Sequence, residues 1–234
     1  DTMRKLFLVV FGFIIPGICL SQQSLLYPDF GNKGKIVANF DNKSNTTYTP
    51  HSIFVTDNNS IFTGGYIGNE YMLHKIRPTG RDDVNFGFNG FRFFDYGTVF
   101  NNRLEEIIKY PGGKTILIGN ISPAASVAGR NTSLMGSSVI RLMPDGNPDI
   151  TFGIKGKVFI TIPFFNFWPA TGVVQPDGKI VIAVRASLYD AAVVLDRLVL
   201  FRLNSNGSLD NSFGTQGIFF IPQQGLTPVP PSPM

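Results

Sequence analysis

The stretch DNSFGTQGIFFI, residues Asp210–Ile221, combines a tight turn with an apolar run, and the chain repeats this combination. Two close versions are DITFGIKGKVFI at Asp149–Ile160 and DDVNFGFNGFRFF at Asp82–Phe94, and a shorter one is PDFGNKGKIV at Pro28–Val37. All of them contain the pattern Phe-Gly-x-x-Gly, which begins at Phe30, Phe86, Phe152 and Phe213. A recurrence every ~60 residues predicts repeated structural units, each of which buries its apolar face against a neighbour.

Two further patterns recur inside each period. The first is a turn followed by an apolar strand: VVQPDGKIVIAV at Val173–Val184, IKYPGGKTILIG at Ile108–Gly119 and a weaker FVTDNNSIFTGG at Phe54–Gly65. Pro, Asp and Gly favour tight turns for separate stereochemical reasons, so these segments predict β-hairpins. The second is a strand with a basic residue before another glycine turn; the basic residues are Lys75, Arg141 and Arg202, and the glycines are Gly80, Gly146 and Gly207.

Each unit is therefore predicted to contain four short strands. In the third unit these are about Lys157–Ile162, Ala170–Gln175, Lys179–Ala186 and Leu198–Asn204. Four strands in ~60 residues match one blade of a β-propeller. The segment NNRLEEIIKY, at 101–110, is the best helix candidate, but its place in the repeat predicts a strand. The expected fold class is all-β: a β-propeller-like repeat of four-stranded antiparallel blades, with about three complete repeats and a closed or an incomplete ring.

The Phe-Gly-x-x-Gly pattern has a structural interpretation. We expect the phenylalanine to fill the seam between neighbouring blades, the first glycine to allow a tight turn, and the second to let the chain enter the next strand. The preceding aspartates can accept hydrogen bonds from turn amides; they are Asp83, Asp149 and Asp210. The pattern lacks the Lys-Ser/Thr pair of a phosphate-binding loop.

The N-terminal segment has the layout of a secretory signal peptide. Arg4 and Lys5 precede the apolar run Leu6–Ile15, which is followed by a Pro-Gly break and small residues. We expect residues 1–21 to be removed after Ser21; a membrane anchor is the alternative, although the run is short for one. Cleavage would remove the only cysteine and with it any disulfide or thiolate metal site. The formal net charge of +4 comes without a Lys/Arg cluster, so we expect neither nucleic-acid nor anionic-lipid binding.

The segments VVQPDGKIVIA and LFRLNSNGSLDNSFGTQG resemble the delta-60 repeat of exported bacterial β-propeller-like proteins. The resemblance extends from about Tyr27 to Ile221 and implies a repeat architecture and export; it implies no catalytic residue. The expected organisation is a signal peptide at 1–21, a repeat domain at 22–222 and a Pro-rich tail at 223–234. The repeats are about 30–85, 86–151 and 152–212, with a partial one at 213–222. Three readings follow: a fragment of a longer propeller, a homodimer that completes a ring, or an open array.

Candidate ligand-binding residues come from aligning the units on their hairpins. His51, Glu105 and Ala170 then begin the strand nearest the central channel, with Arg103 and Trp168 close by. A channel mouth lined by such groups can bind a sugar, so the predicted ligand-binding residues are His51, Arg103, Glu105 and Trp168. Turn or strand-end roles are the alternative for each of them. We predict no catalytic residue, no metal site and no cofactor.

The expected function is an exported, non-catalytic binding or scaffold module at the bacterial cell envelope or surface. Its partner would be a protein or a glycan, and no membrane span would remain after signal cleavage. One alternative is a carbohydrate-binding or carbohydrate-active propeller with a site at the channel mouth. Another is a structural segment of a longer adhesin.

Overall fold

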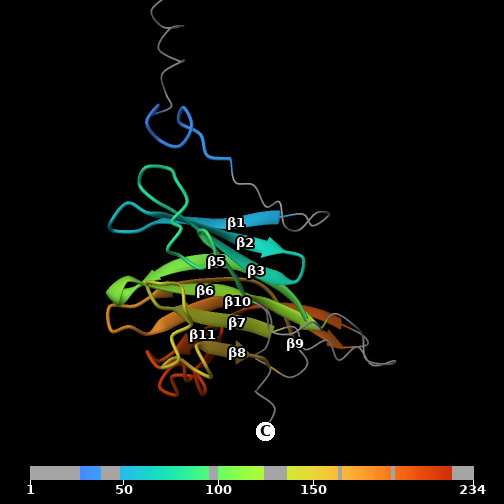
Figure 1. Ribbon diagram of the computed structural model, residues 1–234. Helices are drawn as coiled ribbons and strands as arrows, with labels where there is room; N and C mark the ends of the chain where they lie inside the picture. The colour runs from blue at the N-terminus through green and yellow to red at the C-terminus, as the bar shows by residue number, and fades with distance from the viewer. Residues whose placement is uncertain are drawn as a thin grey trace, which may run out of the picture.

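The computed structural model describes residues 27–37, 48–94, 100–123, 136–162, 165–190 and 193–222. The predicted signal peptide and the Pro-rich tail lie outside these residues. The described chain forms three four-stranded antiparallel sheets (Figure 1), and the described ranges contain no α-helix. Accordingly, the described part offers no helix long and apolar enough to cross a membrane. The predicted all-β fold of four-stranded antiparallel blades is confirmed.

The sheets follow one another in the sequence, and in each one the strands are neighbours in chain order. The first is β1 (Tyr48–Val55), β2 (Ile61–Ile67), β3 (Glu70–Ile76) and β4 (Phe91–Phe94). The second is β5 (Phe100–Tyr110), β6 (Lys114–Pro123), β7 (Gly136–Leu142) and β8 (Lys157–Ile160), with the short 3-10 turn η2 (Pro111–Gly113) between β5 and β6. The third is β9 (Phe165–Val174), β10 (Ile180–Asp190), β11 (Val193–Leu203) and β12 (Ile218–Phe220). The ambiguous segment NNRLEEIIKY lies in β5, as a strand.

The sheet boundaries differ from the sequence units. The strand after each Phe-Gly-x-x-Gly loop pairs with the strand before that loop: β8 pairs with β7, and β12 pairs with β11. The run GIFFI, which we expected to open a fourth unit, therefore completes the third sheet. The physical reason is the loop itself, because its tight turn sends the chain back antiparallel to the strand that it has just left.

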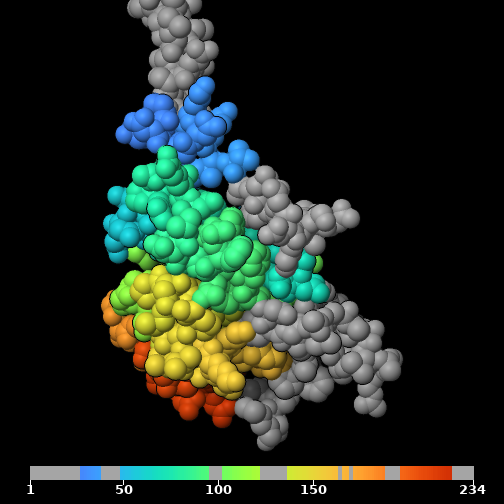
Figure 2. Space-filling view, viewed as in Figure 1, coloured from blue at the N-terminus to red at the C-terminus, as the bar shows by residue number. Residues whose placement is uncertain are grey.

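The sheets stack face to face, with the second between the other two (Figure 1). Strand β5 contacts β1, β2 and β3, and β9 contacts β5, β6 and β7. One hydrophobic core joins the first and second sheets through Tyr71 and Leu117, among others. A second core joins the second and third sheets through Ile118 and Phe201, among others. Figure 2 shows residues 27–37, in blue, at the end of the molecule where the first sheet lies.

At two of the four loops the repeated phenylalanine fills the seam between sheets, as predicted. Phe86 and Phe152 are buried within the first and the second core. Each packs on the glycine turn of the following unit: a Cβ built on Gly146 would lie 2.8 Å from Phe86 Cζ, and one on Gly207 would lie 3.1 Å from Phe152 Cδ2. The seam is also hydrogen-bonded, because Gly153 N donates to the Asn206 carbonyl at 2.8 Å.

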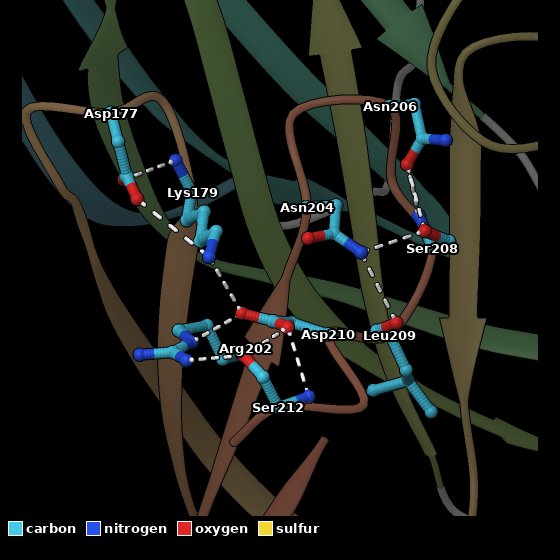
Figure 3. A network of polar contacts seen from close by, with 9 residues as sticks. All are labelled: Asp177, Lys179, Arg202, Asn204, Asn206, Ser208, Leu209, Asp210 and Ser212. Carbon is cyan, nitrogen blue, oxygen red and sulfur yellow. Dashed lines mark hydrogen bonds and ion pairs between the residues drawn. The ribbon is translucent and has the colours of Figure 1, made fainter. Parts of the chain in front are cut away.

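The aspartate before each loop ties the loop to its own sheet (Figure 3). Asp210 accepts hydrogen bonds from Arg202 Nε at 2.7 Å and Ser212 N at 3.1 Å, and it lies 3.0 Å from Lys179 Nζ. The hydrogen bonds from Ser212 and Lys179 hold the pKa of Asp210 well below its usual range. Asp149 has the equivalent contacts with Arg141, Lys114 and Thr151, and Asp83 accepts from Asn85 N. The predicted role of these aspartates in satisfying turn amides is confirmed.

Candidate functional site

The first strand of each sheet carries a bulge at nearly the same position. On β1 the pairing with β2 skips from Pro50 to Ser52, so His51 is the extra residue. On β5 it skips from Leu104 to Glu106, so Glu105 is the extra residue. On β9 the partners of Arg185 and Val184 are Trp168 and Ala170, so the extra position is 169. A bulge redirects the side chain that it carries, and bulges are common beside binding sites.

The bulged residues of the first two sheets meet. His51 Nδ1 lies 3.0 Å from Glu105 Oε2, and their side chains are 32% and 10% exposed. The other carboxylate oxygen, Glu105 Oε1, accepts a hydrogen bond of 3.5 Å from the amide of the buried residue Asn120. The pair therefore presents a partly exposed imidazole beside a carboxylate that Asn120 also holds.

Arg103 and Tyr66 complete this cluster. The guanidinium carbon of Arg103 lies 5.6 Å from the centre of the Tyr66 ring, a cation–π distance. The ring centre of His51 lies 5.4 Å from that of Tyr66 on β2. The structure thus places two of the four predicted ligand-binding residues, His51 and Arg103, against one tyrosine, and a third, Glu105, against His51.

The fourth predicted residue, Trp168, belongs to a separate group on the third sheet. The guanidinium of Arg185 lies over its ring at 5.9 Å, and Arg185 forms an ion pair of 2.6 Å with Asp196. The neighbouring Phe167 is fully buried in the second core and packs on Phe201. Phe167 therefore contributes to packing between sheets, whereas Trp168 lies against Arg185.

Sequence reasoning missed the residues that belong to the second strands and the contacts between first strands. Tyr66 and Asn120 carry no pattern that would single them out. The sequence also contains no pattern that predicts two hydrogen bonds between sheets. In these bonds Ser52 Oγ accepts from Ile107 N at 3.0 Å, and Glu106 Oε2 accepts from Gly172 N at 2.8 Å. Ser52, Glu106 and Thr171 occupy the same position in successive units, so alignment of the hairpins was the signal that could have found them.

A hollow lies at the hairpin ends of the sheets. It has a volume of about 640 Å³ and is lined by parts of all three hairpins, including Thr56, Pro111 and Pro176. Its lysines are Lys75, Lys109 and Lys114, and each has a carboxylate partner, which is Asp83, Asp57 and Asp149 respectively. Because these lysines are already neutralised by carboxylates of the turns, we place the candidate site at the His51–Glu105 pair and not in this hollow.

The second histidine has a structural environment. His74 is buried, stacks on Phe91 with ring centres 4.2 Å apart, and bonds through Nε2 to Asp82 at 2.8 Å. Burial lowers the pKa of His74, and the hydrogen bond with Asp82 opposes that shift without cancelling it. Within the described ranges, no three His, Cys, Asp or Glu side chains gather closely enough to hold a metal ion.

Comparison with known proteins agrees with the fold. A family model described as "Domain of unknown function (DUF5122) beta-propeller" matches residues 175–213. The matched segment begins at the hairpin of the third sheet, includes β10 and β11, and ends at Phe213 of the last Phe-Gly-x-x-Gly loop. No curated protein matches the chain. The chain is therefore an all-β protein with a repeat similar to that of a β-propeller family.

Proposed function

We propose that this protein is an exported, non-catalytic binding module and that the cluster of His51, Arg103 and Glu105 beside Tyr66 holds a glycan. The observation that carries the proposal is the contact between two bulged residues of neighbouring sheets, in which His51 Nδ1 lies 3.0 Å from Glu105 Oε2. Two independent bulges aim these side chains at one place, and bulges are over-represented beside active sites as well as at sheet edges.

The chemistry of the cluster suits a polyhydroxylated ligand. Arg103 offers hydrogen-bond donors, Glu105 offers an acceptor, and the rings of His51 and Tyr66 lie beside them. Sugar hydroxyls both donate and accept, and the C–H faces of a pyranose pack on aromatic rings. A few polar groups that converge beside an aromatic surface are typical of a small-ligand site.

The same chemistry favours binding over hydrolysis. Glycoside hydrolysis ordinarily requires two carboxyl groups ~5–10 Å apart on either side of the scissile bond. The described cluster contributes one carboxylate, Glu105, and it is already bonded to His51 and Asn120. The neighbouring carboxylate of Glu106 is bonded to Gly172 N and to the Thr171 hydroxyl of the third sheet.

Export and the finer family assignment form part of the proposal. The basic start, the apolar run and the small residues up to Ser21 support cleavage of a signal peptide and location at the cell envelope or surface. The match of a β-propeller repeat family to residues 175–213 supports the delta-60 assignment. Cell fractionation and mass spectrometry of the secreted chain test this part, with an expected N-terminus at Gln22. A chain that stays intact in the cytoplasm would contradict it.

The binding proposal is tested with the full chain on an array of bacterial and host glycans, followed by calorimetry on the best glycan. Glu105→Gln removes the negative charge with little change in shape, and we expect it to weaken binding tenfold or more. The matched control is Asp57→Asn, the same change of acid to amide at an exposed hairpin residue, and it should leave the affinity unchanged. Equal affinity for wild type and Glu105→Gln, or no glycan bound by the wild type, would reject the site.

A further inference from the structure

The outer face of the third sheet repeats, position by position, the face by which the second sheet packs on the third. When the hairpin glycines Gly113 and Gly178 are aligned, Ile108, Ile116 and Ile118 correspond to Val173, Val181 and Ala183. When the loop phenylalanines Phe152 and Phe213 are aligned, Val139 and Val158 correspond to Leu200 and Phe219. All ten of these residues are apolar. In the described chain, however, only the five on the second sheet are covered by a neighbouring sheet.

Burial separates the two sets. Ile116, Ile118 and Val139 are fully buried in the second core, between the second and third sheets. On the third sheet, by contrast, Val173 is 61% exposed and Phe219 is 42% exposed. Leu198 is 45% exposed, whereas its counterpart on β7, Ser137, is fully buried. Apolar side chains that stand at the positions of an interface, and yet are exposed to solvent, mark an interaction surface.

The polar part of the interface is repeated as well. Arg141 bonds Asp149 through Nε and Thr151 through Nη2, and its Nη1 donates to the Ser205 carbonyl in the glycine turn of the next unit. Arg202 makes the first two of these contacts, with Asp210 and Ser212 (Figure 3). The side chain of Arg141 is 5% exposed and that of Arg202 is 20% exposed. Among the described residues, no sheet lies on the side of Arg202 that corresponds to the Ser205 contact of Arg141.

The last Phe-Gly-x-x-Gly loop is already in its docked shape. Gly217 N donates to the Phe213 carbonyl at 2.9 Å, as Gly156 N does to the Phe152 carbonyl at 2.9 Å. Gly214 and Gly153 have φ of 56° and 55°. Phe152 uses this shape to reach the turn of Gly207, whereas Phe213 lies against its own sheet, beside Phe219. No rearrangement of the loop is needed before a further glycine turn can pack on Phe213.

The other end of the stack shows the complementary side of such an interface. Residues 27–37 carry a Phe-Gly-x-x-Gly loop with the same bond, from Gly34 N to the Phe30 carbonyl at 2.9 Å, and Gly31 N donates to the Thr79 carbonyl of the first sheet at 3.0 Å. The loop seated on the Gly80 turn therefore has the geometry of a preceding repeat unit. A second copy of this chain would have to displace that loop to bring its own Phe213 to Gly80.

We infer that the outer face of β9–β12 is a blade interface, and that its partner is one further four-stranded unit of the same repeat. That unit would place a left-handed glycine turn on Phe213, accept a hydrogen bond from Arg202 Nη1 on a turn carbonyl, and cover Val181, Ala183 and Leu200 with apolar side chains. The surface is specific because all three contacts recur, with the same spacing, at the interface between the second and third sheets.

The test is a chain in which a copy of residues 161–221 is inserted after Ile221, in the full-length protein with Cys19→Ser. A single cysteine is placed on the face by Leu198→Cys, and its reaction with a thiol reagent is timed. We expect the inserted unit to slow labelling tenfold or more. The matched control is the same insertion with Gly207→Val in the copy only, which blocks the seat for Phe213 and should restore rapid labelling. A cysteine at the exposed hairpin, from Asp57→Cys, should react equally in every chain.

A second readout concerns Phe213. In the natural chain Phe213→Ala should shift the denaturation midpoint far less than Phe152→Ala does, and in the extended chain the two shifts should become similar. The inference is overturned if labelling at position 198 is unchanged, if the inserted unit adds no β signal in circular dichroism, or if Phe213→Ala stays neutral. It is also overturned if the natural chain forms a dimer that Phe213→Ala dissociates, because the partner would then be a second copy.

Discussion

The ring of Phe86 occupies the space that a side chain at Gly146 would need. A Cβ built on Gly146 would lie 2.8 Å from Phe86 Cζ and 2.9 Å from Cδ2, and the glycine has φ of 83°. Packing and backbone geometry thus require glycine at the same residue, which explains why the glycine turn and the Phe-Gly loop recur together.

Gly146→Ala should lower the free energy of unfolding by about 2–4 kcal/mol, because it adds both left-handed backbone strain and overpacking in the seam. Urea denaturation measures the change. Gly112→Ala is the matched control, since Gly112 has φ of 74° with nothing within 4 Å of an added Cβ; it should cost only about 1 kcal/mol. Equal costs at the two positions would mean that the Phe86 contact adds nothing.

Asp149→Asn should destabilise the protein at neutral pH by about 3 kcal/mol or more, because it leaves Arg141 buried without its anion. Burial disfavours the charged form of Asp149, but hydrogen bonds from Lys114 and Thr151 and the nearby Arg141 charge outweigh burial and lower its pKa. The folded state therefore binds fewer protons than the unfolded state below about pH 4, so this stabilisation is lost as the pH falls further.

Urea denaturation at pH 7 and pH 3 checks the prediction for Asp149. The difference between wild type and Asp149→Asn should shrink at pH 3. Asp57→Asn, at an ion pair whose carboxylate is 91% exposed, should change the free energy of unfolding by less than about 1 kcal/mol at either pH. A gap for Asp149→Asn that stays constant between the two pH values would contradict the assigned role of its charge.

His74 should make the first sheet sensitive to mild acid. Its folded pKa is lowered by burial, with Asp82 opposing, so the unfolded state binds more protons as the pH falls below about 6.5. Stability should therefore decrease from pH 7.5 to pH 5.5, and His74→Gln should remove that part of the decrease. Thermal melts at the two pH values measure it. His51→Gln serves as the comparison, and this variant should still lose stability between pH 7.5 and pH 5.5. If His51→Gln abolished that loss of stability, His74 would not be its cause.

Glu106→Ala should weaken the contact between the second and third sheets. The carboxylate accepts a hydrogen bond from Gly172 N at 2.8 Å, and its removal leaves a part-buried amide without that acceptor. We expect a loss of ~1–3 kcal/mol, measured by urea denaturation. Hydrogen exchange at Gly172 should accelerate in this variant but not in Glu105→Ala, whose carboxylate faces His51; acceleration in both would show that the effect is not specific to Glu106.

The repeat, the hairpins and the seam phenylalanine were all predictable, because they depend on local stereochemistry. A Pro-Asp-Gly turn, a Phe-Gly-x-x-Gly loop and alternating apolar residues each limit the backbone within a few residues of themselves. Even the weaker turn at Asp57–Asn59 was recognised from its position, and Asn59 takes the left-handed conformation, with φ of 60°.

The candidate site was predictable only in part. Alignment on the hairpins placed His51 and Glu105 at equivalent positions, and these two residues do meet. The bulges that aim them were not visible in the sequence, because a bulge reflects the mismatch of two paired strands and not the residues of one strand. For the same reason Tyr66 and Asn120 were missed, and Trp168 was grouped with residues of another sheet.

The amino-acid sequence by itself determined the period, the four strands of each unit and the turns that join them, since these follow from interactions between residues close in the chain. Only the tertiary structure decided which strands form one sheet, where the bulged side chains converge, and which apolar face is left open. Those outcomes depend on pairing between distant segments: β8 pairs with β7 and not with β9, because a tight loop returns the chain to the strand that it has just left.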